Sequence, residues 1–150
     1  EITGSEVAFE TGTAMGAIAG HLNLMQWFLK DGQCPFMSEC LFCKIRDGEI
    51  PGDIVYENDH VLAFNDINPV APTHILIIPK EHISTLNDLE ENHTQTMGEL
   101  ILTAKKIAEL KGFSEAGYRT VFNCNEDGQQ TVFHIHLHLI GGRQMSWPPG

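Results

Sequence analysis

The sequence predicts an α+β domain in which an antiparallel sheet of about five strands packs against one long helix. Two observations support this fold class. Short runs rich in β-branched and aromatic residues alternate with turn residues, as in strands joined mainly by hairpins. One long segment repeats apolar residues at helical spacing. With 150 residues, of which 42% are hydrophobic, the chain is large enough for one domain with a buried core.

The first 36 residues do not match the pattern of the rest. Residues 14–29 are mostly apolar, but His21, Asn23 and Gln26 exclude a membrane span. No basic segment precedes them, so a secretory signal is not expected. We expect residues 1–36 to be an extension or an expression-vector remnant with no assigned function. Residues 37–150 should form the domain and its C-terminal tail, with Met37 as the natural start.

The first half of the domain is predicted to consist mostly of strands. Residues 54–56 and 61–64 flank an Asn58-Asp59 turn and therefore favour a hairpin. A proline-containing loop over residues 66–72 follows. Residues 74–79 then form a nearly continuous apolar run, which indicates a central strand covered on both faces.

The second half is predicted to contain the helix. Apolar residues recur over three turns, which predicts a helix over residues 93–110 that Gly112 stops (Met97, Leu100, Ile101, Ala104, Ile107, Ala108). Residues 118–123 read as a further strand. A polar loop over residues 125–128 leads into the last strand.

That last strand, residues 134–140, alternates strictly between histidine and apolar residues. Successive side chains of a strand point to opposite faces, so His134, His136 and His138 should share one face. The first and third lie about 13 Å apart at strand rise, so one metal ion cannot bind all three. The row should therefore serve at least two purposes. The alternative is that the histidines merely fill the polar face of an edge strand.

Charge and cysteine content restrict the function further. The chain has 20 acidic and 9 basic residues and a net charge of −11, which argues against a general nucleic-acid binder. A phosphate site must therefore use imidazole and backbone N–H donors. No apolar run is long enough to span a bilayer. Cys40 and Cys43, as Cys-x-x-Cys, favour a metal half-site and a reducing compartment, so a cytoplasmic location is expected.

The histidine motif continues into the tail Gly-Gly-Arg-Gln-Met-Ser-Trp-Pro-Pro-Gly, residues 141–150. From about Cys40 to Gly150 the chain resembles the histidine triad (HIT) family, in its Hint branch of purine nucleoside phosphoramidases. The resemblance implies hydrolysis of purine nucleoside 5′-phosphoramidates through a nucleotidyl-histidine intermediate. Two alternatives remain open: a dinucleoside polyphosphate hydrolase of another branch, or a nucleotide-binding regulator or scaffold protein.

The catalytic residues follow from imidazole chemistry and from the resemblance. A neutral imidazole can attack phosphorus and then be displaced, which divides one difficult substitution into two easier ones. His136, the middle histidine, matches the family's nucleophile. His138 should lie beside the transferring phosphate and donate to its oxygens or to the leaving amine. His74 matches a further family position near the nucleophile.

The resemblance also implies the substrate-binding residues. Phe64 and Ile67 should flank the purine ring, and Asp66 should accept hydrogen bonds from the ribose hydroxyls. Without the family match, Asp66 reads as a turn residue before Asn68-Pro69. The phosphate should be held by the loop before the histidines, through four matching positions (Asn123, Gln129, Gln130, Thr131). Gln129 stands where the family usually has glycine and would restrict a positive φ there.

The same resemblance implies a zinc site and a dimer. His82 and His134 would complete a Cys₂His₂ zinc site with Cys40 and Cys43, and four protein ligands make it structural. No organic cofactor is expected. The sheet should continue across a homodimer, with Trp147 near the partner's active site. The other cysteines, Cys34 and Cys124, should be unpaired thiols, and three further histidines should be surface or capping residues (His21, His60, His93).

Overall fold

The structure, a computed structural model, describes residues 39–149. The predictions made for the N-terminal extension, for Met37 as its boundary, and for His21 and Cys34 lie outside the described residues.

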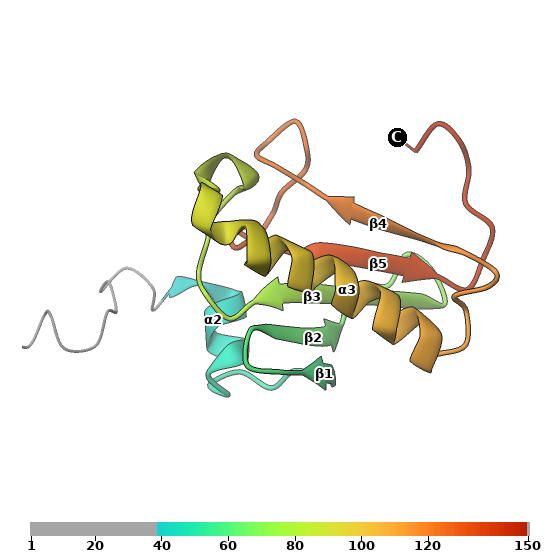
Figure 1. Ribbon diagram of the computed structural model, residues 1–150, viewed down its shortest axis with the longest axis horizontal. Helices are drawn as coiled ribbons and strands as arrows, with labels where there is room; N and C mark the ends of the chain where they lie inside the picture. The colour runs from blue at the N-terminus through green and yellow to red at the C-terminus, as the bar shows by residue number, and fades with distance from the viewer. Residues whose placement is uncertain (1–38, 150) are drawn as a thin grey trace, which may run out of the picture. The chain divides into compact units, whose positions relative to one another are not determined.

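The described chain contains a five-stranded antiparallel sheet with the order β1-β2-β3-β5-β4 (Figure 1). The strands are β1 (Ile54–Glu57), β2 (Val61–Asn65), β3 (Thr73–Pro79), β4 (Tyr118–Phe122) and β5 (Leu137–Gly141). The predicted fold class is confirmed, and so is the first hairpin. Asn58 forms its turn, where the side-chain oxygen accepts hydrogen bonds from the backbone N–H groups of His60 and Val61, both at 2.8 Å.

One long helix, α3 (Thr94–Leu110), crosses the sheet as predicted. It ends just before Gly112, whose φ of 77° is the left-handed conformation common after a helix C-terminus. Before it, His93 caps a short 3-10 turn, because its Nδ1 accepts the backbone N–H of Glu90 at 2.9 Å. A short helix, α2 (Leu41–Arg46), follows its N-cap residue Cys40. Within residues 39–149, the structure contains no helix long and apolar enough to cross a membrane.

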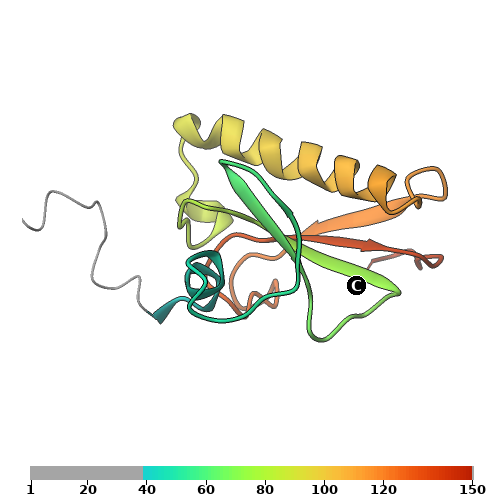
Figure 2. The same cartoon turned by 90° about the horizontal axis from the view of Figure 1, so that it is seen from below.

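Apolar side chains cover both faces of the sheet. Helix α3 packs on one face, while α2 and the loop before β5 lie on the other (Figure 2). On the α3 side, buried residues of the strands and helix form the larger core (among them Ile75, Ile77, Leu100, Ile107, Leu139). On the α2 side, a smaller cluster is formed by five buried residues (Phe42, Leu62, Phe64, Leu76, Ile78). Strand β3 is therefore buried on both faces, as its continuous apolar sequence predicts.

The histidine strand is shorter than predicted, because only its second half belongs to the sheet. Strand β5 begins at Leu137. The backbone N–H of Ile135 instead donates to the carbonyl of Ile83, outside the sheet, at 2.7 Å. The apolar alternation is nevertheless kept, since Ile135 and Leu137 are buried in the larger core. Strand β5 lies between β3 and β4, so the alternative of a polar edge strand is wrong.

Candidate active site and metal centre

His136 is held in one orientation by its own chain. Its Nδ1 lies 2.8 Å from the carbonyl oxygen of His134, which can act only as a hydrogen-bond acceptor. The Nδ1–H of His136 therefore donates, and the lone pair of the neutral ring lies on Nε2. Burial lowers the pKa of His136, with the backbone hydrogen bond acting in the opposite direction. Burial is the larger effect, so it favours a neutral imidazole whose Nε2 is available as a nucleophile.

His74 and His138 form a second pair, on adjacent strands β3 and β5. The backbone N–H of Val70 donates to Nδ1 of His74 at 3.3 Å, so the proton of the neutral ring is on Nε2. This Nε2 donates to Nδ1 of His138 at 2.9 Å. His138 must then carry its own proton on Nε2. The hydrogen-bond chain thus makes His138 a donor at the atom that faces away from His74.

The donor atom of His138 has no partner. Among the described residues, its Nε2 is the buried side-chain nitrogen or oxygen that lacks a hydrogen bond. Leaving such a group unpaired is costly, so it indicates a place for a ligand atom. The rings of His138 and His136 lie 4.8 Å apart between centroids. Burial, together with the neighbouring His136 and His74, lowers the pKa of His138 to about 4.

Asp66 makes two contacts. One is that of an ordinary turn residue, and the other places its carboxylate beside the predicted catalytic histidines. One carboxylate oxygen accepts the backbone N–H of Asn68 at 2.8 Å, as in an ordinary turn. The other lies 3.5 Å from Nε2 of His74. The carboxylate therefore lies beside the histidine pair, and it is partly accessible.

The loop before the histidines is tightly wound. A Cβ atom at Gly128 would lie 2.5 Å from the carbonyl oxygen of Cys124, so this position needs glycine. The next residue, Gln129, has a φ of 60°. The loop thus requires a positive φ at the position where the family usually has glycine, and Gln129 adopts it despite its side chain.

We predict that Gln129→Gly stabilises the fold by roughly 0.5–1 kcal/mol, because the strain of a left-handed side-chain residue is relieved at some entropic cost. Urea denaturation measures the difference. Asn125 has a φ of 58° and is the matched control. Asparagine tolerates this conformation, so Asn125→Gly should change the stability less. A lower midpoint for Gln129→Gly would contradict the prediction.

The side chain of Gln130, a predicted phosphate donor, uses both its amide nitrogen and its amide oxygen in hydrogen bonds within the protein. Its amide nitrogen donates to the carbonyls of Ser84 and Val132, at 2.7 and 3.1 Å. Its amide oxygen accepts the backbone N–H of Asn125 at 3.0 Å. Gln130 therefore braces the loop. The backbone N–H groups of Gln129 and Gln130 also bond within the loop, which leaves Asn123, half-buried, and Thr131, exposed, as the predicted donors at its ends.

The predicted purine-binding residues differ in exposure. Ile67 is 92% exposed on the loop between β2 and β3, whereas Phe64 is buried. Phe64 packs edge-to-face with Phe42 of α2, at 5.5 Å between ring centroids. Phe42 also meets the ring of His136 at 5.1 Å. The sequence interpretation did not include Phe42, although its place inside the Cys-x-x-Cys segment could have indicated it. Trp147 is 84% exposed in the tail.

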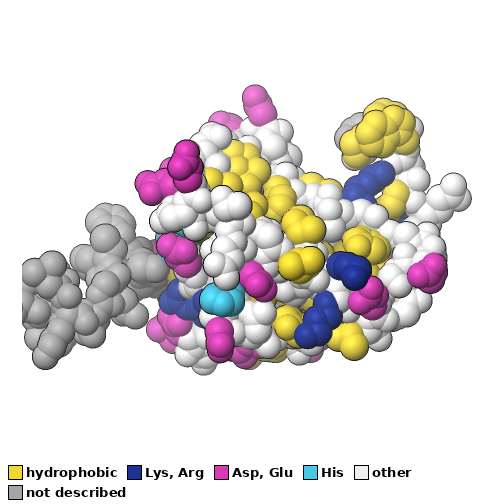
Figure 3. Space-filling view, viewed as in Figure 1, with side chains coloured by type: hydrophobic (Ala, Val, Ile, Leu, Met, Phe, Trp, Pro, Cys, Tyr) yellow, Lys and Arg dark blue, Asp and Glu magenta, His cyan; other side chains and the backbone are white. Residues whose placement is uncertain are grey.

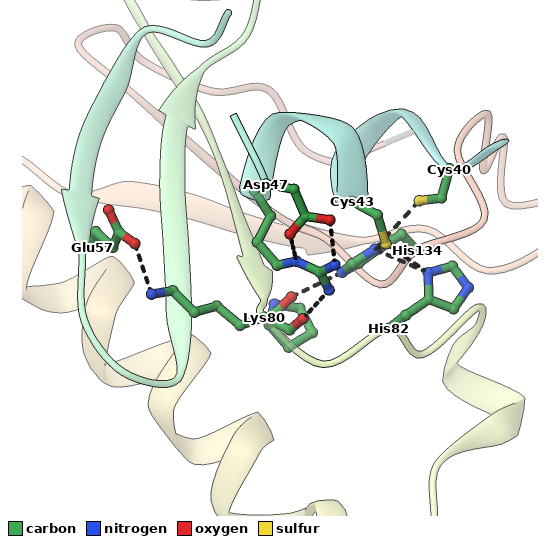
Figure 4. Close-up of polar contacts among 9 residues, drawn as sticks. Cys40, Cys43, Asp47, Glu57, Lys80, His82 and His134 are labelled. Carbon is green, nitrogen blue, oxygen red and sulfur yellow. Dashed lines mark hydrogen bonds and ion pairs between the residues drawn. The ribbon is translucent and has the colours of Figure 1, made fainter. Parts of the chain in front are cut away.

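The four predicted metal ligands come together (Figure 4). Nδ1 of His82 lies 3.3 Å from Nδ1 of His134, and Sγ of Cys43 lies 3.3 and 3.5 Å from these two atoms. Sγ of Cys40 lies 3.5 Å from Nδ1 of His134. A tetrahedral zinc ion with ordinary Zn–N and Zn–S bonds would separate nitrogen from nitrogen by about 3.3 Å and nitrogen from sulfur by about 3.5 Å. The donor set and its spacing therefore fit a tetrahedral metal ion.

The surroundings of the cluster also fit a metal site. Nε2 of His134 lies 2.9 Å from the carbonyl of Pro79, to which it donates, so Nδ1 keeps its lone pair for a metal. Burial lowers the pKa of His134 to about 4 and keeps the ring neutral. Burial and the neighbouring Cys40 raise the pKa of Cys43 to about 11. A thiolate at Cys43 therefore requires a cation beside it, which a bound metal would supply.

Comparison with known proteins identifies the family to which this fold and its paired histidines belong. The HIT domain model matches residues 47–145. The chain is 54% identical over 107 residues to the purine nucleoside phosphoramidase of Escherichia coli, covering 71% of this chain and 90% of that protein. It is 53% identical over 115 residues to the 14 kDa zinc-binding protein of Zea mays, with coverage of 75% and 89%.

A solved structure agrees. The HIT family hydrolase of Legionella pneumophila Philadelphia 1 superposes with a TM-score of 0.74 at 57% identity, covering 75% of this chain and 100% of that one. The chain therefore belongs to the HIT family, as its histidine motif predicts.

Proposed function

We propose that this protein hydrolyses purine nucleoside 5′-phosphoramidates, releasing a nucleoside monophosphate and an amine. The observation that carries the proposal is the complementary protonation of two adjacent histidines. His136 is held with its lone pair on Nε2, and His138 is held with its proton on Nε2. A nucleophile and a hydrogen-bond donor thus lie side by side. Support also comes from the E. coli relative, which is named a purine nucleoside phosphoramidase.

The reaction divides into two displacements at phosphorus. In the first, Nε2 of His136 attacks, the P–N bond to the amine breaks, and a nucleotidyl-histidine forms. His138 donates from Nε2 to a phosphoryl oxygen or to the departing nitrogen, where charge develops. In the second, water attacks phosphorus, the bond to His136 breaks, and the proton that water loses replaces the one that the amine took away in the first step. The carbonyl of His134 keeps its hydrogen bond to Nδ1 of His136 and stabilises the charge that the ring gains on attack.

Substrate binding would use both ends of the site. The carboxylate of Asp66 lies next to His74 and could accept hydrogen bonds from the ribose hydroxyls. The exposed side chain of Ile67 offers an apolar surface to the base. Asn123 and Thr131 could donate to the phosphate. A panel of adenosine and guanosine 5′-phosphoramidates, set against dinucleoside polyphosphates, tests the proposal: phosphoramidates should be cleaved much faster, and the reverse order would reject it.

The Cys₂His₂ cluster is proposed to hold a structural zinc ion. With four protein ligands there is no open position for substrate. The site would link α2, the segment after β3 and the segment before β5, which supply its ligands. The zinc-binding name of the Zea mays relative supports the choice of metal.

We predict about one zinc ion per chain after purification without chelators. Elemental analysis should find this ratio in the unaltered protein and in Cys124→Ser, because that thiol lies outside the cluster. Cys43→Ser removes one of the four ligands and should lose most of the metal. An unaltered protein free of zinc, or a Cys43→Ser variant that retains it fully, would contradict the assignment.

A homodimer is proposed from the exposed edge of the sheet. Strand β4 has a partner on one side only, and soluble proteins usually cover or pair such edges. The C-terminal tail is fixed beside this edge, because Arg119 of β4 donates to the carbonyl of Ser146 at 2.6 Å. Apolar side chains of the tail stand clear of the body in Figure 3. Trp147 would then be buried against a second copy of the chain.

We predict that deleting residues 145–150 changes the preference among leaving amines more than it changes nucleotide affinity. The reason is that Trp147 would line the partner's leaving-group side, away from the base. Values of kcat/KM for a series of amines, with nucleotide affinity measured by calorimetry, make the comparison. An unchanged amine profile would reject this role of Trp147, and a monomer by light scattering at micromolar concentration would reject the dimer.

The remaining assignments follow from composition. The acidic charge of −11 supports a protein that does not bind nucleic acid in general. The Cys-x-x-Cys segment, read as a metal site, supports a cytoplasmic location. Both stay predictions.

A further inference from the structure

The metal cluster and the nucleophile share a residue. His134 contributes Nδ1 to the cluster, while its backbone carbonyl accepts the Nδ1–H of His136 at 2.8 Å. The side chain of His134 is completely buried. A shift of its ring would therefore move the carbonyl that fixes the orientation of His136.

Helix α2 makes a second connection. Phe42 lies between the cysteine ligands in the sequence. Its ring packs edge-to-face against the rings of His134 and His136, at 6.1 and 5.1 Å between centroids. Only 4% of Phe42 is exposed. The aromatic ring that packs against the nucleophile thus lies on the same short helix as Cys43, directly after Cys40 at the N-cap.

Helix α2 depends on its attachments, because six residues are too few to form a stable isolated helix. Its N-cap residue, Cys40, makes no capping hydrogen bond through its side chain. At the other end, Arg46 donates to the carbonyl of Lys80 at 2.6 Å. The N-terminal end of α2, which carries Phe42, is therefore held by polar contacts mainly through the metal cluster.

We propose that metal binding at the Cys₂His₂ cluster positions the nucleophile, through the carbonyl of His134 and the ring of Phe42. This rests on the proposed role of His136. His134 and Phe42 are positioning residues, since they act on His136 and not on the substrate. Small displacements of a reacting group can reduce a rate about 100-fold, so a loosened cluster should be visible in the rate.

The test compares His82→Ala with the control Glu57→Gln. His82 belongs neither to the segment of Cys40, Phe42 and Cys43 nor to the histidine segment, and its side-chain contacts are with the cluster and Ser84. Glu57 pairs with Lys80 on the surface nearby. In His82→Ala we expect loss of zinc and nucleotidylation of His136 that is slower by at least about tenfold. The ¹⁵N NMR signals of the His136 ring should show exchange between its two tautomers. Glu57→Gln should keep the zinc, the rate and the single Nδ1–H tautomer.

A second variant keeps the inference testable if His82→Ala does not fold. Phe42→Leu retains all four ligands and should bind zinc normally, yet slow nucleotidylation by about threefold to tenfold. A zinc-free, folded His82→Ala with the unaltered tautomer and rate would overturn the inference. So would a Phe42→Leu variant with an unaltered rate. Failure of the proposed function differs, because the unaltered protein itself would then not be nucleotidylated by a phosphoramidate.

Discussion

Replacing His136 by alanine should abolish turnover while leaving nucleotide binding largely intact. The nucleophilic Nε2 is lost, whereas the proposed binding groups, such as Asp66 and Thr131, remain. Removing a covalent nucleophile elsewhere costs on the order of 10³-fold or more in kcat, and we expect a loss of this size. Steady-state and single-turnover rates measure it, and calorimetry with a nucleoside monophosphate measures binding.

The control for this experiment is His60→Ala. His60 is an exposed histidine in the β1–β2 turn, so its loss should leave the rate unchanged. Circular dichroism checks that both variants are folded. Turnover by His136→Ala within a few-fold of the unaltered protein would reject His136 as the nucleophile.

Replacing His138 by alanine should have the second-largest effect, about 10²-fold to 10³-fold in kcat. A preorganised donor to developing charge is typically worth this much. The unpaired Nε2 of His138 has its proton fixed there by His74. His74→Ala should therefore also slow the reaction, but less, because His138 remains and merely loses the contact that selects its tautomer.

A series of leaving groups separates the two possible roles of His138. If it donates to the departing nitrogen, the loss should shrink for a leaving group that needs little assistance, such as a nitrophenolate. If it donates to the phosphoryl oxygens, the loss should stay the same across the series. A His138→Ala variant with nearly unaltered rates for every substrate would exclude both roles.

Much of the fold was predictable, because local patterns and tertiary structure agree there. The hairpin around Asn58 and the amphipathic helix α3 depend on turn chemistry and periodicity, which a single sequence contains. The start of β5 was not predictable. Alternation continues through His134 and His136, but Ile135 pairs with Ile83 in a loop, and such a long-range contact leaves no local signal.

The residues of the candidate site were largely predictable, but the role of each residue was less so. The resemblance to the family identified the cluster ligands and the histidine pair, which the structure brings together. It could not indicate that Gln130 uses its amide to brace the loop, since this depends on the position of Ser84. Nor could it show that Gln129 accepts a positive φ, or that Phe42 meets His136.

The nucleotidyl-histidine itself provides the most direct test of the mechanism. Rapid mixing with a purine nucleoside phosphoramidate, followed by quenching and mass spectrometry, should reveal one nucleotidyl group per active site. Fragmentation of the peptide that contains the three histidines should place this group on His136, and it should be absent from His136→Ala. A fully active enzyme that forms no such adduct, or carries it on another residue, would contradict the account.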